Sequence, residues 1–300
     1  RAGQGLISIF VMSILIFVMS RAPADAAFVL LPDDALPGQL EQIKHGLKLD
    51  LPMYEQYGWW LWNALHGDLG RSTSRPALSV MDIIKQRLPN TMVLAGTGFV
   101  ISTAVGISVG IFAAVSHGKL IDLFARLFAI LGQSAPGFWV GVMLIILFAV
   151  ILGWLPAGGM GGPNTIILPA LTLGWAASAS KMRLTRSAML EVLDSEYIKL
   201  ARIKGVREGI VIWKHALKNA ALPIVTFLGL ALVGLITGAI IAETIFAWPG
   251  IGRMMYQAIL SRDFPVIQGG VLMITLAYVT ANLAVDIIYG FLNPRIRFGG

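Results

Sequence analysis

The sequence predicts an all-α fold of six transmembrane helices, and two features support that prediction. First, 56% of the 300 residues are hydrophobic and only 13% are charged, whereas about a quarter are charged in soluble domains. Second, several apolar runs approach the ~20 residues that a helix needs to cross ~30 Å of hydrocarbon. The chain also has no cysteine, which excludes a disulfide framework and a thiolate metal site. The class that follows is a polytopic helical membrane protein.

The first apolar run covers residues 2–19, and we expect a transmembrane helix over residues 1–20. A cleaved signal peptide is the alternative, because residues 22–26 resemble a signal-peptidase site. The run is long for the apolar core of a signal peptide, which favours a retained helix. The chain begins with Arg1 rather than methionine, so we expect an unknown number of native residues before it.

Residues 21–89 form a long polar segment, which we expect outside the membrane. Two helices are predicted within it, at about residues 39–45 and 53–65, because a glycine follows each and a proline precedes the second. The second helix carries an aromatic cluster, Tyr54, Tyr57, Trp59, Trp60 and Trp62. Such a cluster beside a bilayer usually anchors at the lipid headgroups. A contact with a substrate-delivering protein is the alternative.

Five further spans are expected in a core at residues 90–294, and a tail follows at residues 295–300. The spans are predicted at 91–115, 126–154, 166–180, 222–246 and 266–292. The fourth is the weakest, because residues 175–180 are small and semi-polar. Pro136 predicts a kink in the third span. Small residues in the fifth predict close helix contacts: Gly229, Gly234, Gly238 and Ala239.

Basic residues gather between the fourth and fifth spans, in a segment at 181–219 that we expect to be a loop. It holds Lys181, Arg183, Arg186, Lys199, Arg202, Lys204, Arg207, Lys214 and Lys218. The loops at 155–165 and 247–265 hold none and two, respectively. Because basic loops stay in the cytoplasm, we expect this segment and both termini inside, with residues 21–89 outside. The net charge of +7 therefore reflects topology and membrane lipid rather than nucleic acid.

A short amphipathic helix is predicted at residues 196–204 within this basic segment. Four of its residues recur at i, i+3, i+4 and i+7 and share one face: Tyr197, Leu200, Ala201 and Lys204. Three turns have too little surface to fold alone, so this face must be buried against something else. Its own bundle or lipid would satisfy that need, and so would a groove on a soluble partner.

The ends of this short helix have local signals. Asp194 or Ser195 can cap its start, and Gly205 suits the left-handed conformation that ends a helix. A second helical run is expected from about residue 210 to residue 219. Pro223 is then expected at the start of the fifth span, where a missing N–H group matters little.

Three acidic residues lie in or beside the later spans: Glu243, Asp263 and Asp286. An ionised side chain is unfavourable inside a membrane, so each is a functional candidate. Arg253 and Arg262 lie near the first two in sequence. A structural ion pair there fits the pattern as well as a gate or a substrate contact does. For Asp286 we expect pairing with a cytoplasmic basic residue.

The sequence contains no motif for catalysis or nucleotide binding. Nothing matches the G-x-x-x-x-G-K-[ST] phosphate cradle, and the glycine-rich run at 158–162 has no lysine after it, so we expect a turn there. The four histidines are scattered without an H-E-x-x-H, and no G-x-S-x-G elbow occurs. We therefore expect no enzyme activity, no metal and no cofactor.

Several short motifs stand in order along nearly the whole chain. Residues 196–223 hold Glu196-Tyr197-Ile198, Ala201-Arg202, Lys204-Gly205, His215-Ala216-Leu217, Asn219-Ala220 and Leu222-Pro223. Further motifs stand at 87–91, 153–156, 243–252 and 262–265. Their order and spacing resemble those of ABC importer permeases, most closely the dipeptide/oligopeptide/nickel group. Tyr197 replaces the small residue of many importers, and the distance from Gly205 to Pro223 is long, as in the peptide group.

The resemblance implies roles for two sets of residues. In that family the helix at 196–204 is a coupling helix that enters a groove on the ATPase subunit, which implies docking by Glu196, Tyr197, Ile198, Leu200, Ala201, Arg202, Lys204 and Gly205. The region between the fifth and sixth spans lines the outer gate, which implies Trp248, Pro249, Gly250 and Gly252. The carboxylates Glu243 and Asp263 join that set as candidates. Local pattern predicts a turn at Pro249-Gly250 and a short helix at 254–260.

The resemblance also implies a fold and partners. We expect a type I importer permease in the bacterial inner membrane, with two ATP-binding subunits, a second homologous permease in a heterodimer and an external solute-binding protein. Peptides are the first substrate expected; nickel chelates, glutathione and oligosaccharides stay open, because specificity lies largely in the binding protein. A self-sufficient secondary transporter is the alternative. It would need midplane carboxylates and often an internal repeat, and the sequence has no clear sign of either.

Overall fold

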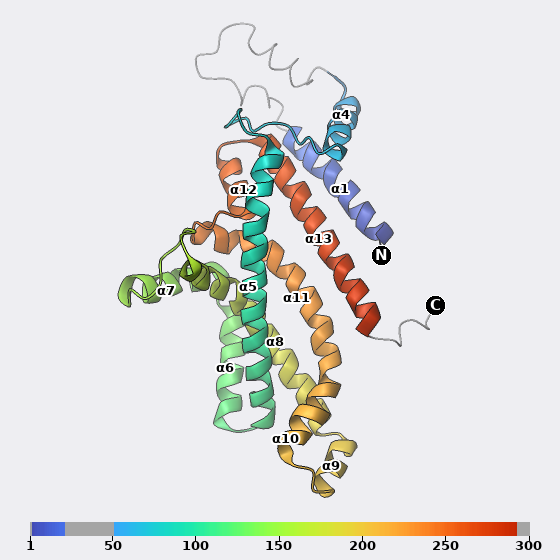
Figure 1. The fold of residues 1–300 in the computed structure, drawn as a ribbon, viewed down its shortest axis with the longest axis vertical. Coiled ribbons are helices and arrows are strands. Elements are labelled where there is room, and N and C mark those ends of the chain that lie inside the picture. Colours follow the sequence, from blue (N-terminus) through green and yellow to red (C-terminus); the bar gives the residue numbers. More distant parts are fainter. Residues whose placement is uncertain (1, 22–50, 293–300) are drawn as a thin grey trace. The chain divides into compact units, whose positions relative to one another are not determined.

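The computed structural model describes residues 2–21 and 51–292, and the regular structure in those ranges is helical (Figure 1). This confirms the all-α prediction. No β-strand occurs in those ranges, where the nearest feature is an isolated antiparallel bridge between Arg71 and Ser79. The helix predicted at 39–45 and the tail at 295–300 lie outside the described residues.

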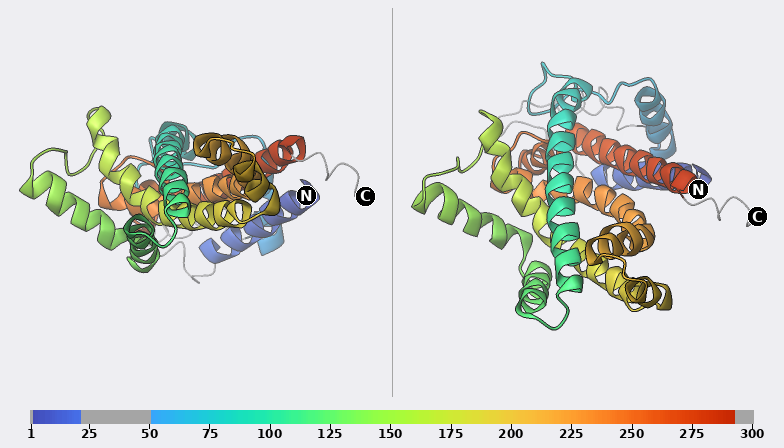
Figure 2. Two further views of the ribbon diagram at one scale, coloured as in Figure 1. Left: turned by 90° about the horizontal axis from the view of Figure 1, so that it is seen from below. Right: turned by 60° about the horizontal axis from the view of Figure 1, so that its bottom comes forward.

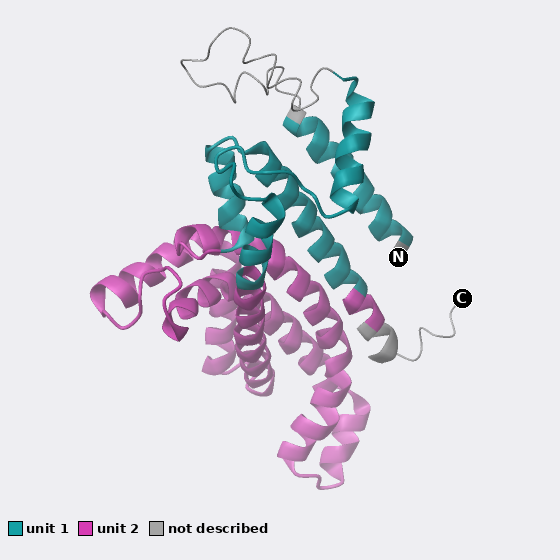
Figure 3. Ribbon diagram, turned by 45° about the horizontal axis from the view of Figure 1, so that its top comes forward, with its two compact units in different colours: residues 1–90, 250–283 teal, residues 91–249, 284–300 magenta. Residues whose placement is uncertain are grey.

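The chain forms two compact units (Figure 3). Unit 1 comprises residues 1–90 and 250–283, and it holds α1 (Ala2–Arg21), α4 (Met53–Leu65), the start of α5 (Val80–Val115), α12 (Ile251–Leu260) and most of α13 (Phe264–Leu292). Unit 2 comprises residues 91–249 and 284–300. It holds the rest of α5, α6 (Leu120–Ser134), α7 (Gly137–Leu144), a π-helical segment (Ile145–Ile151), a 3-10 turn (Pro163–Ile166), α8 (Ile167–Leu193), α9 (Glu196–Ile203), α10 (Glu208–Ile210), a second π-helical segment (Val211–Ala216) and α11 (Leu217–Ile245).

Four described helices are long and apolar enough to cross a membrane: Gly3–Ser20, Val80–Val115, Glu208–Ile245 and Phe264–Ile287. A fifth candidate is the pair Leu120–Ser134 and Gly137–Ile151, which is bent by 109°. The kink predicted at Pro136 is therefore confirmed. The predicted count of six is not confirmed. The predicted fourth span corresponds to α8, which has 27 residues but carries Lys181, Arg183 and Arg186 after a small, semi-polar stretch.

Several helices extend beyond the predicted spans. α5 begins at Val80 instead of residue 91, and α6 begins at Leu120 instead of residue 126. α8 continues to Leu193, so residues 181–193 are helical where a connecting loop was expected. The helices expected within that loop at 196–204 and 210–219 correspond to α9 and to the helical run from Glu208, and only 194–195 and 204–207 lie outside helices there. Hydropathy marks where lipid ends, whereas lysine, arginine, methionine and leucine remain good helix formers in water.

The ends of the shorter helices agree better with prediction. α4 occupies Met53–Leu65 as predicted, and α12 at Ile251–Leu260 contains the predicted helix at 254–260. Pro223 is different, because it lies inside α11 instead of at its start. The helix already begins at Glu208 and runs through the π-helical segment. Pro223 therefore lies in the helix interior, where its missing N–H group removes one backbone hydrogen bond.

In unit 1, α1 and α4 pack through aromatic side chains. The ring of Phe17 lies 5.4 Å from that of Tyr57 and 5.7 Å from that of Trp60, centroid to centroid. The hydroxyl groups of Tyr57 and Ser13 are 2.8 Å apart. Trp62 is 66% exposed. The predicted aromatic cluster is therefore divided, with one part holding α4 to α1 and another part available to lipid or to a partner.

A buried carboxylate in unit 1 fastens the segment before α5 to the corner between α12 and α13. Asp263 is 1% exposed, and it accepts hydrogen bonds from the hydroxyls of Ser72 and Ser74 and from the N–H groups of Thr73 (3.1 Å) and Ser74 (3.3 Å). Burial raises the pKa of Asp263, but these donors outweigh burial and lower the pKa below its usual value. Its partners in the described part of the chain are neutral, so the ion pair considered for it does not form there.

In unit 2, α8 packs against α6, α7 and α11 (Figures 1 and 2). It also lies against α5, where small residues recur at a spacing of four: Gly98, Ser102, Gly106 and Gly110. A Cβ atom at Gly106 would lie 2.6 Å from the Cβ atom of Lys181, and one at Gly110 would lie 2.7 Å from that of Thr185. Only small residues allow two helices to approach this closely, as in other membrane bundles.

Lys181 is buried at this contact, although the sequence places it among the basic loop residues. Its ammonium group donates to Ser102 Oγ at 2.6 Å and to Thr103 Oγ1 at 2.9 Å. It also lies 4.4 Å from the ring centroid of Phe99. All three partners belong to α5, so the hydroxyls and the aromatic face compensate the buried charge and join α8 to α5.

We expect Asp263→Asn to release the segment at 66–79. An amide places an N–H donor where the carboxylate accepts hydrogen bonds, so at least one N–H group of Thr73 or Ser74 loses its acceptor, at a cost of roughly 1–3 kcal/mol. Limited trypsin digestion should then cut after Arg71 faster than in the wild-type protein, whereas Pro76 keeps the bond after Arg75 resistant in both. Glu55→Gln, an exposed carboxylate of α4, is the control. Equal cutting rates in all three proteins would contradict the role of Asp263.

The stability that Asp263 contributes through these hydrogen bonds also depends on pH. The lowered pKa of Asp263 means that its contribution is fully present above the ordinary carboxyl pKa of ~3.9 and is lost as the pH falls through the lowered value. Protection of the wild-type segment should therefore not change across the neutral and mildly acidic range.

A second expectation concerns the contact of α5 with α8. Gly106→Ala adds a Cβ atom 2.9 Å from the carbonyl oxygen of Ser178, and overpacking of this kind destabilises by roughly 1–3 kcal/mol. Gly96→Ala lies on the same helix with no atom within 4 Å of the new Cβ, and should be neutral or slightly stabilising. The midpoint of thermal unfolding in detergent distinguishes the two. Equal midpoints would mean that α5 and α8 do not touch at Gly106.

Candidate functional site

α9 is a short helix whose two ends follow the local signals in the sequence. Ser195 occupies the N-cap position in an extended conformation, although its hydroxyl group donates to the Val192 carbonyl instead of capping α9. Gly205 has a φ of +77°, which confirms the left-handed stop. The N–H group of Gly205 bonds to the Arg202 carbonyl at 2.9 Å, and that of Val206 bonds to the Ala201 carbonyl at 3.2 Å.

One side of α9 is anchored in unit 2, and the other side is open. Ile198 is fully buried in an apolar cluster that includes Leu193, Val211 and Ala216. On the outer side, Leu200 is 51% exposed and Ile203 is 81% exposed. The predicted face is therefore mostly the outer one: Tyr197, Leu200 and Lys204 are exposed, and Ala201 is half-buried.

Two ion pairs set the charges around α9. Arg202 donates from Nε and Nη2 to the carboxylate of Glu208 at 3.1 and 2.7 Å, which joins α9 to α10. The hydrogen bonds that Arg202 donates to Glu208 raise the pKa of Arg202. Lys199 and Glu196 form an exposed pair at 2.9 Å. Exposed pairs add little stability, so the burial of Ile198 is the main anchor of the helix.

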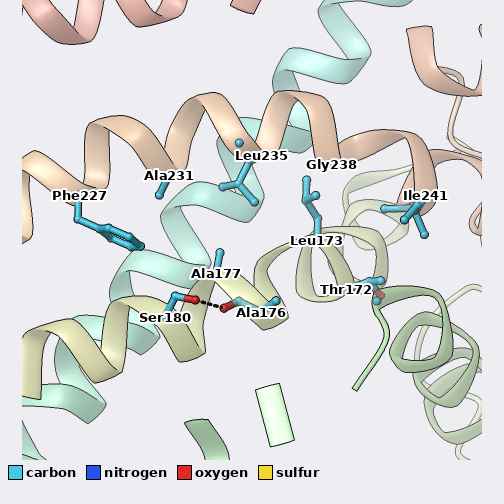
Figure 4. A pocket seen from close by; sticks show the side chains of 13 residues that line it. Thr172, Leu173, Ala176, Ala177, Ser180, Phe227, Ala231, Leu235, Gly238 and Ile241 are labelled. Carbon is cyan, nitrogen blue, oxygen red and sulfur yellow. Dashed lines mark hydrogen bonds between the residues drawn. The ribbon is translucent and has the colours of Figure 1, made fainter. Parts of the chain in front are cut away.

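A groove of about 350 Å³ lies between α8 and α11 (Figure 4). Its walls are Thr172, Leu173, Ala176, Ala177 and Ser180 of α8 and Phe227, Ala231, Gly234, Leu235, Gly238, Ile241 and Ala242 of α11, with Gly137 at one end. The lining has no ionisable side chain, and the Ser180 hydroxyl bonds to the Ala176 carbonyl at 3.1 Å. The volume is at the lower end of the range for small-molecule sites. Such a surface can guide a solute but provides few groups to select one.

The residues of the predicted outer gate do not fall in one compact unit. Glu243, Trp248 and Pro249 belong to unit 2, whereas Gly250, Gly252 and Asp263 belong to unit 1. The described contacts of Asp263 fasten the segment at 66–79, as shown above.

In unit 2, Glu243 is fully buried and accepts a hydrogen bond from Thr91 Oγ1 at 2.6 Å. Trp248 is buried against Leu94, Ala170 and Ala242. The glycine-rich segment at 158–162 reaches the same region, where the N–H group of Gly159 bonds to the Phe246 carbonyl at 2.7 Å. These contacts make the end of α11 a packed corner, in which Glu243 supplies a buried acceptor.

The sequence reasoning missed the groove and the seam of small residues on α5. The close approach predicted at Gly229 is confirmed, because a Cβ atom there would overlap the side chain of Val285 of α13. Gly234 and Gly238 line the groove, and a Cβ atom would meet nothing within 4 Å at Gly234 and Leu173 of α8 at 3.5 Å at Gly238. The spacing of Gly98, Ser102, Gly106 and Gly110 was the signal for the α5 contact with α8. The groove has no equivalent signal, because it depends on which faces of α8 and α11 meet. Within the described residues, no three histidine, aspartate or glutamate side chains gather as metal ligands do.

Comparisons with known proteins cover almost the whole chain. The family model for the binding-protein-dependent transport system inner membrane component matches residues 106–298, and the model for the N-terminal part of such components matches residues 1–95. A Brucella abortus protein named as a peptide transport system permease is 40% identical over 309 aligned positions, which cover 99% of this chain and 98% of that protein. The glutathione transport system permease GsiC of Escherichia coli is 39% identical, over 98% and 96% of the two chains.

Solved structures agree at the level of the fold. An inward-facing form of the MetNI methionine ABC transporter has a chain with a TM-score of 0.59 and 18% identity, covering 71% of this chain and 97% of that one. An amino acid ABC transporter solved with histidines gives a TM-score of 0.52 and 18% identity, over 71% and 94%. The family models span the sequence, and the helical fold agrees. This chain therefore belongs to the family of binding-protein-dependent transport system inner membrane components, the permease subunits of bacterial ABC importers.

Proposed function

We propose that this permease forms half of the translocation pathway for peptides, and that α9 is the helix through which an ATPase subunit drives it. A permease of this family is not itself catalytic and works with ATPase and substrate-binding partners. The observation that supports the role of α9 is its arrangement: Ile198 fixes the helix to the protein, while Leu200 and Ile203 stay exposed. An apolar helix surface at the end of a bundle favours a protein partner that covers it.

The connections of α9 explain how its movement would reach the pathway. Two residues join it to α8, and four residues join it to α10 and α11. α8 and α11 are also the two walls of the groove. A displacement of α9 would therefore act on both walls. ATP can bias the inward and outward states only if the ATPase subunits bind them with different affinity, and a docked α9 provides that link.

A second permease would complete the pathway. The groove uses one face each of α8 and α11, and a homologous chain related by a pseudo-two-fold axis would present an equivalent groove opposite. We infer a heterodimer with two ATP-binding subunits and an external solute-binding protein.

The substrate class rests on the relatives and on the character of the groove. The two relatives are named for peptide and glutathione transport. The groove lining carries no charge, so it suits solutes whose charge differs from one to the next. Glutathione is the second candidate. Nickel chelates, oligosaccharides and a self-sufficient secondary transporter have no observation in their favour.

The proposed orientation places α9 in the cytoplasm, with both termini inside and the segment before α5 outside, and it rests on the distribution of basic residues. Ala77→Cys and Arg207→Cys test it, because both positions are exposed and the chain has no other cysteine. An impermeant thiol reagent added to intact cells should label position 77 and not position 207. Both should be labelled after lysis. The opposite pattern in intact cells would reverse the orientation.

The docking role of α9 predicts the effect of Leu200→Asp. A carboxylate in a covered apolar contact is left unpaired, which weakens the contact by several kcal/mol. Transport and ATPase stimulation by loaded binding protein should fall at least about a hundredfold, and the ATPase subunit should dissociate from the purified complex. Lys199→Ala is the control, because it removes an exposed charge from the same helix and leaves the apolar surface intact.

The permease itself should fold in both variants, because Leu200 contributes little to the protein's own core. The yield of monodisperse permease measures this. Normal ATPase stoichiometry and full stimulation in Leu200→Asp would show that the ATPase subunit binds elsewhere and would refute the coupling role.

A further inference from the structure

A second pocket in unit 2 uses a different part of α8 from the groove. It has a volume of about 290 Å³ and lies between α6 and α8. Three guanidinium groups line it, those of Arg126, Arg183 and Arg186, together with Gln133 and the apolar side chains of Ile130 and Met182. The coupling role of α9 and the groove use none of these residues.

The arginines of this pocket are only partly neutralised. Asp122 is buried behind them, and its carboxylate accepts from Nε and Nη2 of Arg186 at 2.6 and 3.0 Å. Arg126 Nε lies 3.7 Å from the same carboxylate. Arg183 donates to the neutral Gln133 Oε1 at 3.0 Å. Arg186 and Arg126 share one carboxylate, and among the described residues no carboxylate lies within ion-pair distance of Arg183, so the pocket retains positive charge.

The surroundings of the pocket are apolar and exposed. Leu123, Leu127 and Ile130 of α6 are all exposed beside it. Arg183 follows the start of α8 by 16 residues, which corresponds to about 24 Å along a helix and approaches the thickness of a bilayer's hydrocarbon core. Exposed apolar side chains beside a basic pocket, near one end of a membrane helix, are the pattern expected where a protein meets the boundary between lipid acyl chains and headgroups.

We propose that this pocket binds the phosphate of an anionic phospholipid, with Arg183 and Arg126 as the ligands and the apolar surface of α6 beside the acyl chains. Guanidinium groups match the oxygens of a phosphate by paired hydrogen bonds. Asp122 holds Arg186 in place and neutralises much of its positive charge. The other two arginines are therefore the ones available to bind the ligand. Basic pockets between transmembrane helices on the cytoplasmic side recognise such headgroups. The choice of leaflet rests on the proposed orientation.

The test compares lipids on the purified importer complex in detergent. Phosphatidylglycerol or phosphatidylcholine is added, and native mass spectrometry counts the lipids retained by the permease. The wild-type complex should retain phosphatidylglycerol about tenfold more strongly than phosphatidylcholine. Arg183→Gln should reduce phosphatidylglycerol retention about tenfold, as expected for one lost charge-assisted hydrogen bond, and should leave phosphatidylcholine unchanged. Lys218→Gln removes an exposed positive charge elsewhere in unit 2 and should change neither.

Arg126→Gln provides a second variant if Arg183→Gln assembles poorly, and the comparison of the two lipids on the wild-type complex needs no variant. Equal retention of both lipids would overturn the proposal. Displacement of the lipid by millimolar inorganic phosphate would assign the pocket to a free anion instead. Loss of the second permease in Arg183→Gln, with lipid retention unchanged, would assign it to a protein contact. The cysteine labels decide the orientation separately, so failure here with position 207 inside would leave the proposed function intact.

Discussion

The close approach of α8 to its neighbours is the constraint on which unit 2 depends. In a membrane, lipid tails are as apolar as leucine, so burial of apolar surface does not drive helices together as it does in water. Contact area and polar groups must hold them instead. Gly106 and Gly110 bring α5 to within contact of α8, and Lys181 adds an ammonium group that hydroxyls of α5 accept. α8 is therefore held in one position by groups that tolerate little displacement.

The three flanks of α8 have different chemistry. The flank toward α5 packs against small residues and includes the buried Lys181. The flank toward α6 carries Arg186, which pairs with Asp122 of α6. The flank toward α11 is neutral and lines the groove. The charges of Lys181 and Arg186 are thus placed where another helix compensates them. The helix continues from these contacts to α9 with a break of two residues, so a partner that moves α9 acts directly on a groove wall. A closely packed helix transmits such a movement better than a loop would, because its neighbours allow few intermediate positions.

Local signals were predictable from the sequence, and pairings between helices were not. Gly205 and Pro136 act through their own backbones, so their effects, a left-handed stop and a break in the chain, need no knowledge of the fold. The extent of α8 was misjudged because hydropathy reports the lipid boundary, while the helix continues beyond it to Leu193. Periodicity placed Leu200 on one face of α9, but only the packed structure shows that Ile198 is the anchor and that the Leu200 side is open.

The absence of ionisable side chains from the groove lining suits the role of a pathway that we propose for it. A fixed charge at low dielectric would bind an oppositely charged solute deeply and repel a solute of like charge, so one carboxylate or guanidinium would restrict the range of cargo. Passage requires that binding be strong enough to admit a solute and weak enough to release it. The groove has space because some of its lining residues are small, and these add no strong binding site: Ala176, Ala177 and Gly238. In the proposed function, selection is left to a separate binding protein, and the energy for directional movement comes through α9, because the groove itself has no strong interaction to change between states.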